Sequence, residues 1–306
     1  MEFDRGAWAE AGGHLDDVEL YGSVARVAAI TEGDGRILAA VHPRDPSVGL
    51  LWDWVGGEEP LRAAEGWLRD SGCRVARGPM AVCTWFDHRA NLGPFDDAPM
   101  AREPMAEGAP WSRAGYRVLR EYASVVSPHH SSIRAAVSPA AALASSGWSI
   151  DTPGDGGGEP LSERAFAEYL ADMSAMAERV YGDEPEFAPM PIDVLLRYFG
   201  PVRAHLDARL LVRARDPDGE LAALLWAYPD TLCPERGWFV LRTLFLSRAH
   251  RDLGVGAWTV GAAHQAARKA GYTEGIRSLV PIRHSDTSGT RGARLVRRYA
   301  LYERVL

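Results

Sequence analysis

The sequence has few cysteines, no long apolar run and no basic leader, and each absence excludes a class of protein. The three cysteines (Cys73, Cys83 and Cys233) are widely spaced and form no CxxC pair, which excludes a disulfide framework and a zinc site. No run of about 18 apolar residues is present, so we expect no membrane span. The N-terminus has no basic segment followed by an apolar stretch, which is unlike a signal peptide. We therefore expect a cytoplasmic protein with free thiols and no bound metal.

Lysine is nearly absent as well, and the charge is unevenly distributed. Lys269 is the only lysine among 34 basic residues, a usage typical of a GC-rich genome. The net charge of -7 argues against a general nucleic-acid binder. Residues 242–306, however, hold 12 basic and 4 acidic residues, a net of +8, whereas residues 1–241 have a net of -15. An anionic partner should therefore meet the last 65 residues.

The length of 306 residues favours two domains at about 150 residues each. In the first half, hydrophobic patterning and turn residues predict one helix and five strands. The helix is expected over 59–71, and the strands over 24–31, 36–42, 49–55, 73–77 and 116–126.

The segment from 127 to 160 is rich in Ser, Ala, Gly and Pro, a composition typical of an interdomain linker, with a short helix possible over 138–145. The second half repeats the order of the first. Helices are expected over 162–181, after Pro191 and over 255–270, and strands over 209–214, 221–228, 238–246, 275–282 and 296–305. We predict a domain over 1–135, a linker over 136–160 and a related domain over 161–306.

The most informative segment runs from Leu244 to Trp258 and joins a buried strand to a helix. Its Arg251-Asp-Leu-Gly254-Val-Gly256 pattern leaves the first amides of the helix free to bind phosphate oxygens. The pattern is neither a Walker A motif nor a GxGxxG fingerprint. It resembles the acyl-CoA pyrophosphate loop of the GNAT acyltransferase superfamily. The closing Arg298-Tyr299-Ala-Leu-Tyr302 segment and the residues around Gly78-Pro79 in the first half are similar to the tandem type of that superfamily.

This resemblance implies two tandem GNAT-like α/β domains, each a mixed, mostly antiparallel sheet flanked by helices. It implies that pantetheine contacts the backbone of Phe245 and Leu246, while Arg251 and the amides of Gly254, Val255, Gly256 and Ala257 hold the pyrophosphate. The reaction would transfer an acyl group directly from acyl-CoA to a small-molecule amine, with no permanently bound cofactor.

Two departures from the pattern leave the donor open. Asp252 and Leu253 stand where related loops often carry glycine and a basic residue, which favours a carrier-protein phosphopantetheine with its single phosphodiester. The basic C-terminal segment suits CoA and an acidic acyl-carrier protein equally. The first half has Gly56-Gly57-Glu58-Glu59 in the place of a loop, so we expect a degenerate domain that binds no donor and shapes the acceptor pocket or stabilises its twin.

The catalytic residues are less well defined. His284 suits a proton shuttle and Tyr299 a donor to the leaving thiolate, although a turn histidine and a core tyrosine are the plain alternatives. The His129-His130 pair is expected to be exposed in the linker, and Trp85, Trp111 and Trp226 are candidates for an acceptor cleft. Because no obvious base precedes the loop, a non-catalytic pantetheine-binding or scaffolding module is the alternative function.

Overall fold

The structure is a computed structural model that describes residues 8, 10, 12, 14–95, 98–153, 161–282 and 293–306. Its helices are α2 (Leu15–Gly22), α3 (Glu59–Asp70), α4 (Gly108–Arg113), α5 (His129–Ser145), α6 (Glu163–Tyr181), α7 (Ile192–Phe199) and α8 (Val255–Lys269). Its strands are β1 (Arg26–Glu32), β2 (Gly35–Val41), β3 (Val48–Val55), β4 (Val75–Gly78), β5 (Ala90–Gly93), β6 (Arg117–Pro128), β7 (Ser149–Asp151), β8 (Val212–Arg215), β9 (Leu221–Pro229), β10 (Trp238–Leu246), β11 (Glu274–Pro281) and β12 (Arg294–Val305).

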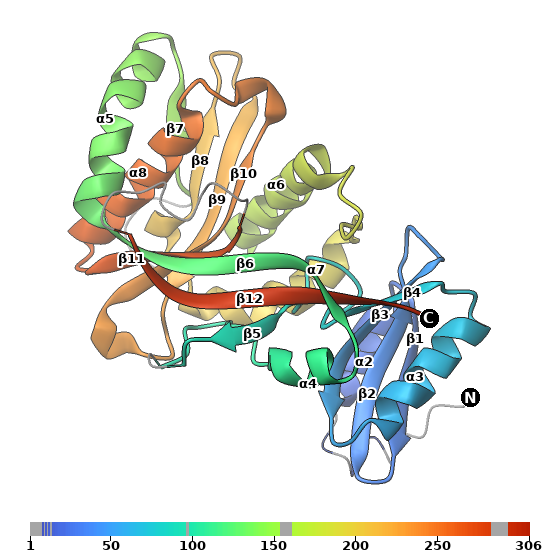
Figure 1. Cartoon of the computed structure of the whole chain (residues 1–306). Helices are drawn as coiled ribbons and strands as arrows, with labels where there is room; N and C mark the ends of the chain where they lie inside the picture. Colours follow the sequence, from blue (N-terminus) through green and yellow to red (C-terminus); the bar gives the residue numbers. More distant parts are fainter. Residues whose placement is uncertain are drawn as a thin grey trace.

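These strands form one mixed sheet in the order β1-β2-β3-β4-β12-β6-β11-β10-β9-β8-β7, with β5 added beside β12. The pairs β3–β4 and β10–β11 are parallel, and the other pairs are antiparallel. The long strands β6 and β12 cross the middle of the molecule between the two ends of the sheet (Figure 1). Strand β6 comes from the first half of the chain yet pairs with β11, and β12 ends the chain yet pairs with β4. The two halves are therefore joined by exchanged strands.

The structure differs from the predicted linker over 136–160. Helix α5 occupies much of this segment and packs along α8, and β7 pairs with β8 at the edge of the sheet (Figure 1). The physical reason is that alanine is the strongest helix former and that Ala136 and Leu143 bury their side chains. A composition that looked too poor in large apolar residues to build a core is enough to cover a neighbouring helix.

Most of the other predicted elements are confirmed. The expected helices over 59–71, 162–181 and 255–270 correspond to α3, α6 and α8. Ser162 caps α6, because its hydroxyl accepts a hydrogen bond from the amide of Ala165 at 3.2 Å. The sequence did not reveal three short elements, namely α2, α4 and β5. They are too short for a periodic pattern to build up.

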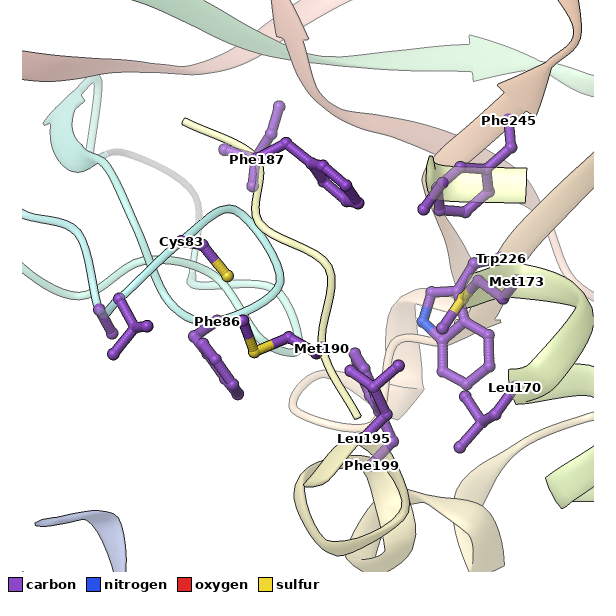
Figure 2. Close-up of a cluster of buried hydrophobic side chains, with 14 of the residues drawn as sticks. Cys83, Phe86, Leu170, Met173, Phe187, Met190, Leu195, Phe199, Trp226 and Phe245 are labelled. Atoms are coloured by element: carbon purple, nitrogen blue, oxygen red, sulfur yellow. The ribbon is translucent and has the colours of Figure 1, made fainter. Parts of the chain in front are cut away.

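Helices α5 and α8 cover one face of the second half of the sheet, and α6 and α7 cover the other (Figure 1). The largest core lies on the α6 side and is shared by both halves of the chain. Figure 2 shows Cys83 and Phe86 from the first half gathered with Met173, Trp226 and Phe245 from the second. Among the described residues, no helix combines the length and the apolarity that crossing a membrane requires.

Candidate functional site

The parallel strands β10 and β11 pair over only four residues and then separate. Trp238 to Leu241 align with Glu274 to Arg277, and no further pair joins the two strands. Strand β10 has a bulge between Leu241 and Thr243, where its register with β9 shifts. Strand β11 continues along β6 instead. Beyond this point the backbone groups of β10 that face β11 form no hydrogen bonds with it. An extended ligand can therefore be inserted between the two strands.

A cavity of about 680 Å³, here called the donor cavity, lies at this separation. Its lining comes from β10, β11, the first turns of α8 and the N-terminal part of α5. The lining residues are Ser131, Ser132, Arg134, Ala135, Leu225, Leu241, Arg242, Leu244, Gly256, Ala257, Val260, Arg277, Ser278 and Val280. Three of them are arginines and none is an acid. The donor cavity is therefore suited to a ligand that is partly apolar and carries negative charge.

The turn that leads into α8 has two residues with a left-handed backbone. Asp252 has φ +68° and Gly254, the N-cap, has φ +82°. Glycine suits the second position, since an added Cβ would also lie 2.6 Å from Pro139 of α5. At the first position the left-handed region also favours glycine, and Asp252 occupies it as a non-glycine residue.

The amides of the first turn of α8 have no acceptor within the helix and lie at the positive end of its dipole. Gly256 and Ala257 of this turn line the donor cavity, whereas the side chain of Val255 is buried in the core. Arg251 is exposed beside the turn. Of the residues expected from the sequence to hold the pyrophosphate, Gly256 and Ala257 line the donor cavity, while Arg251 and Gly254 lie in the turn that precedes them.

The two residues expected to contact pantetheine point to opposite faces of the sheet. Leu246 faces α8, and its side chain lies near the Cα of Gly256. Phe245 is buried on the other face against Tyr181 and Trp85, with ring centroids 5.7 and 6.5 Å apart. Their backbone lies in the part of β10 that has left β11, as a β-like contact with a ligand requires.

Arg277 of β11 also lines the donor cavity. Its Nε is buried and has no hydrogen-bond partner among the residues that the structure describes. Burial lowers the pKa of this guanidinium, because the cation loses hydration that no described carboxylate replaces. A buried donor without an acceptor is costly in a folded chain, and an anionic or carbonyl oxygen in the donor cavity would satisfy it.

Tyr299, a predicted proton donor, lies at zero exposure on the α6 side of the sheet. Its hydroxyl donates to Oε1 of Glu103 at 2.7 Å and lies 3.1 Å from the hydroxyl of Ser124. Glu103 in turn accepts a hydrogen bond from Arg297 at 2.8 Å. Burial, followed by the charge of Glu103, raises the pKa of Tyr299 well above its usual range, so the hydroxyl keeps its proton. The other predicted catalytic residue, His284, lies outside the described residues.

The expectation that the His129-His130 pair is exposed is wrong for His129. This residue begins α5, and its Nδ1 lies 3.0 Å from Nδ1 of His264 on α8. Its Nε2 lies 2.9 Å from the carbonyl oxygen of Tyr272. Burial and the neighbouring imidazole lower the pKa of His264 to about 3, so the ring is neutral. The contact between His129 and His264 therefore joins α5 to α8. Among the described residues, no group of three or more potential metal ligands is found.

The three candidate tryptophans are divided between two cores. Trp111 packs with Tyr116 and Trp54 in the first half, away from the donor cavity. Trp226 is buried in the core that both halves share, and Trp85 is partly buried at the edge of the same core. Sequence reasoning missed Arg89 and Arg277, since nothing in the local sequence distinguishes a buried arginine from the many surface arginines of this chain.

Comparisons with known proteins concern the fold. No protein-family model and no curated protein matches the sequence. Among solved structures, the chain is similar to a GCN5-related glucosamine N-acetyltransferase region of a fungal multi-domain GH3 β-N-acetylglucosaminidase. The identity is 14%, the match covers 98% of this chain and 36% of that chain, and the TM-score is 0.56.

The chain is also similar to a probable N-acyltransferase from Enterococcus faecalis V583, at 9% identity over 98% of this chain and 68% of that chain, with a TM-score of 0.56. A tandem GNAT protein from the clavulanic acid biosynthesis pathway matches at 14% identity over 94% of this chain and 87% of that chain, with a TM-score of 0.49. The chain therefore has the fold of GCN5-related N-acetyltransferases, a large mixed sheet flanked by helices.

Proposed function

We propose that the protein is an acyltransferase that moves an acyl group from a pantetheine thioester to an amine by direct transfer. The observation that carries this proposal is the donor cavity. It opens where β10 and β11 separate, it is bordered by the first turn of α8, and its lining contains three arginines and no acid. An extended pantetheine arm with a phosphate at one end matches both the shape and the charge of such a site.

The donor is either acyl-CoA or an acylated carrier protein. Arg134, which lines the donor cavity, and Arg251, in the turn before α8, are both exposed, so they are accessible to a pyrophosphate and to an acidic protein surface alike. Asp252 places a carboxylate in the same turn and weakens a site for two phosphates more than a site for one. The two donors are distinguished by experiment, as described below.

The reaction needs a neutral amine to attack the thioester carbonyl. A carbon–nitrogen bond forms, the carbon–sulfur bond breaks, and the proton lost by the amine balances the charge of the released thiolate. We keep His284 and Tyr299 as the candidate proton carriers. A catalytic role predicts that Tyr299→Phe or His284→Gln lowers kcat and leaves CoA binding unchanged.

The first half is proposed to be a degenerate domain without a donor site. Its corresponding helix, α3, begins beside Glu58 and Glu59, whose carboxylates repel phosphate. Glu58 also accepts a hydrogen bond from Arg62 at 2.9 Å, which engages the nearest arginine. The proposed reaction therefore has a single donor site per chain.

The test is a calorimetric titration with CoA of the wild type and of Ala257→Glu. A glutamate in the first turn suits the helix dipole, so the fold is preserved, while its charge repels phosphate in the donor cavity. The matched control is Gln265→Glu, which adds the same charge at an exposed position two turns further along α8. We expect Ala257→Glu to weaken CoA binding at least tenfold and the control to behave as wild type. Equal binding by all three proteins would contradict the proposal.

The carrier-protein donor is tested with the same variants. If free CoA does not bind but an acylated carrier protein is turned over, the donor is the carrier protein. A non-catalytic pantetheine-binding module is the second candidate, favoured by the lack of any carboxylate or histidine among the described lining residues. Binding of CoA without turnover of any donor in a screen of amine acceptors would support this second function.

A further inference from the structure

A second group of basic side chains lies on the α6 side of the sheet. Arg89, in the loop between β4 and β5, places its guanidinium carbon 3.8 Å from the ring centroid of Tyr122 on β6. Arg242 lies at the bulge of β10, and its Nη1 lies 3.5 Å from the carbonyl oxygen of Arg102. We call Arg89 and Arg242 the arginine pair. Arg242 also lines the donor cavity, so the arginine pair is adjacent to the point at which a thioester would cross the sheet.

The arginine pair has no counter-charge among the described residues. Neither guanidinium forms an ion pair there, and Nε of Arg89 is buried without a hydrogen-bond partner. The nearby acids are engaged elsewhere or lie at the surface. Glu103 pairs with Arg297, Asp230 accepts from the amide of Ala101 at 2.8 Å, and the exposed Asp87 lies 3.4 Å from the hydroxyl of Tyr198.

The remaining groups that face the arginine pair add no negative charge. They are His88 and the hydroxyls of Tyr122, Tyr181, Tyr198 and Tyr228, which come from the β4–β5 loop, β6, α6, α7 and β9. Burial, with the nearby Arg242 acting in the same direction, lowers the pKa of Arg89 to about 10. Two cations held together without an anion are unfavourable in a folded protein unless a ligand supplies the missing charge.

The backbone of this region is also strained. Arg89 has φ +82° and Arg102 has φ +55°, both in the left-handed region that non-glycine residues avoid. Arg89 is held there by its amide, which donates to the carbonyl of Pro79 at 2.8 Å. Strain of this kind costs on the order of 1–3 kcal/mol and concentrates at ligand sites, where it fixes a side chain in position.

We infer that the arginine pair binds an anionic group of the acceptor, a carboxylate or a phosphate, and that the acceptor is therefore an amine that also carries negative charge. This inference rests on the proposed transferase reaction. Arg89 packs against Tyr122 on the face opposite α8, whereas Arg242 lies at the separation of the strands and also lines the donor cavity, so an anion held by both belongs to the molecule that meets the thioester from the α6 side. Guanidinium groups bind carboxylates and phosphates with paired hydrogen bonds, and the surrounding tyrosine rings favour an acceptor with an apolar part.

The test uses three small probes that share a ring and differ in charge: phenylacetate, phenyl phosphate and the neutral phenylacetamide. Each is titrated at constant ionic strength into the wild type, Arg89→Gln, Arg242→Gln and the control Arg164→Gln, and binding is followed by Trp fluorescence. Arg164 is 90% exposed on α6, so its replacement removes the same charge without touching the arginine pair. Binding of CoA is measured in parallel on every protein.

We expect at least one anionic probe to bind the wild type and the control, and the neutral amide to bind at least tenfold more weakly. Each arginine variant should weaken the anionic probe about 10- to 100-fold. Arg89→Gln, which lies outside the donor cavity, should leave CoA binding unchanged. The relative affinity of the carboxylate and the phosphate identifies the acceptor's anionic group.

The inference is overturned if no anionic probe binds at about millimolar concentration, with the probe in up to 20-fold excess over the protein. It is also overturned if binding of the probe survives both arginine substitutions. If the wild type neither binds CoA nor turns over an acylated carrier protein while it still binds the anionic probe, the proposed transferase function is overturned instead, so the two failures are distinguishable. With an active donor, the same reasoning predicts that Arg89→Gln raises KM for an amino acid acceptor more than for the corresponding amine without its carboxylate.

Discussion

The contact between α5 and α8 gives a prediction whose sign is set by geometry. A Cβ added at Gly261 of α8 would meet the Cβ of Ala136 on α5 well inside van der Waals contact, which for carbon atoms is roughly 3.5–4.0 Å. Neither group has a rotamer that relieves the overlap, so Gly261→Ala must push the helices apart. Overpacking of this kind costs about 1–3 kcal/mol, and the better helix propensity of alanine offsets about 1 kcal/mol of that. Because this overlap joins two Cβ atoms that cannot rotate away, the upper part of the overpacking range applies, and we expect a net destabilisation of about 1–2 kcal/mol.

The matched control is Gly66→Ala on α3, where an added Cβ meets nothing within 4 Å. The same substitution should there raise stability by about 0.5–1 kcal/mol through helix propensity alone. The assay is thermal unfolding followed by circular dichroism. At about 2–4 °C per kcal/mol, Gly261→Ala should lower Tm by roughly 2–8 °C, while Gly66→Ala raises it slightly.

A second variant shows whether the contact itself is responsible. Combining Gly261→Ala with Ala136→Gly moves the methyl group from α5 to α8 and should recover much of the lost Tm. Because the N-terminal part of α5 lines the donor cavity, Gly261→Ala should also weaken CoA binding. Equal stabilisation by Gly261→Ala and Gly66→Ala would refute the packing of α5 on α8 and, with it, this wall of the donor cavity.

Three further predictions follow from individual residues. Asp252→Gly should raise stability by about 0.5–1 kcal/mol by relieving a left-handed backbone, and should tighten CoA binding by removing a carboxylate beside the phosphate site; weaker binding would contradict this. Burial lowers the pKa of His264 to about 3 and that of His42 to about 4, so below pH 6.5 only the unfolded chain takes up protons at these two sites. The free energy of unfolding should therefore fall from pH 6.5 toward pH 4, by about 1.4 kcal/mol per pH unit for each histidine. Thermal unfolding across this pH range measures how steeply the stability depends on pH. In His264→Gln this dependence should be weaker, because one proton fewer is taken up on unfolding. Glu103→Gln should cost about 3–5 kcal/mol in urea unfolding, since it leaves the buried Arg297 without its counter-charge; a loss below 1 kcal/mol would show that the pair is not buried in solution.

The sequence was informative where local patterns determine structure. The turn between β1 and β2, the cap at Ser162 and the strand-to-helix loop at Gly254 each depend on nearby residues, and the predicted elements around them are confirmed. The loop residues expected to bind phosphate are brought together because they are consecutive in the chain.

Features that depend on distant contacts could not be predicted in this way. The exchange of β6 and β12 between the halves depends on which edges are available once both sheets form. Helix α5 was anticipated only as a short helix over 138–145 within a linker, because its small side chains become a packing surface only when Gly261 of α8 lies opposite. Arg89 gains its significance from Arg242, which is more than 150 residues away in the sequence. Its unusual environment therefore has no local signature.

The central claim is that a pantetheine donor occupies the separation between β10 and β11. Hydrogen–deuterium exchange of the wild type with and without saturating CoA tests this claim most directly, because the backbone of the site is its main component. The account predicts slower exchange in the peptides that cover 242–246, 254–258 and 277–280, with no change in β1 to β3 of the first half. Unchanged exchange in these three segments, or protection confined to the first half, would contradict it.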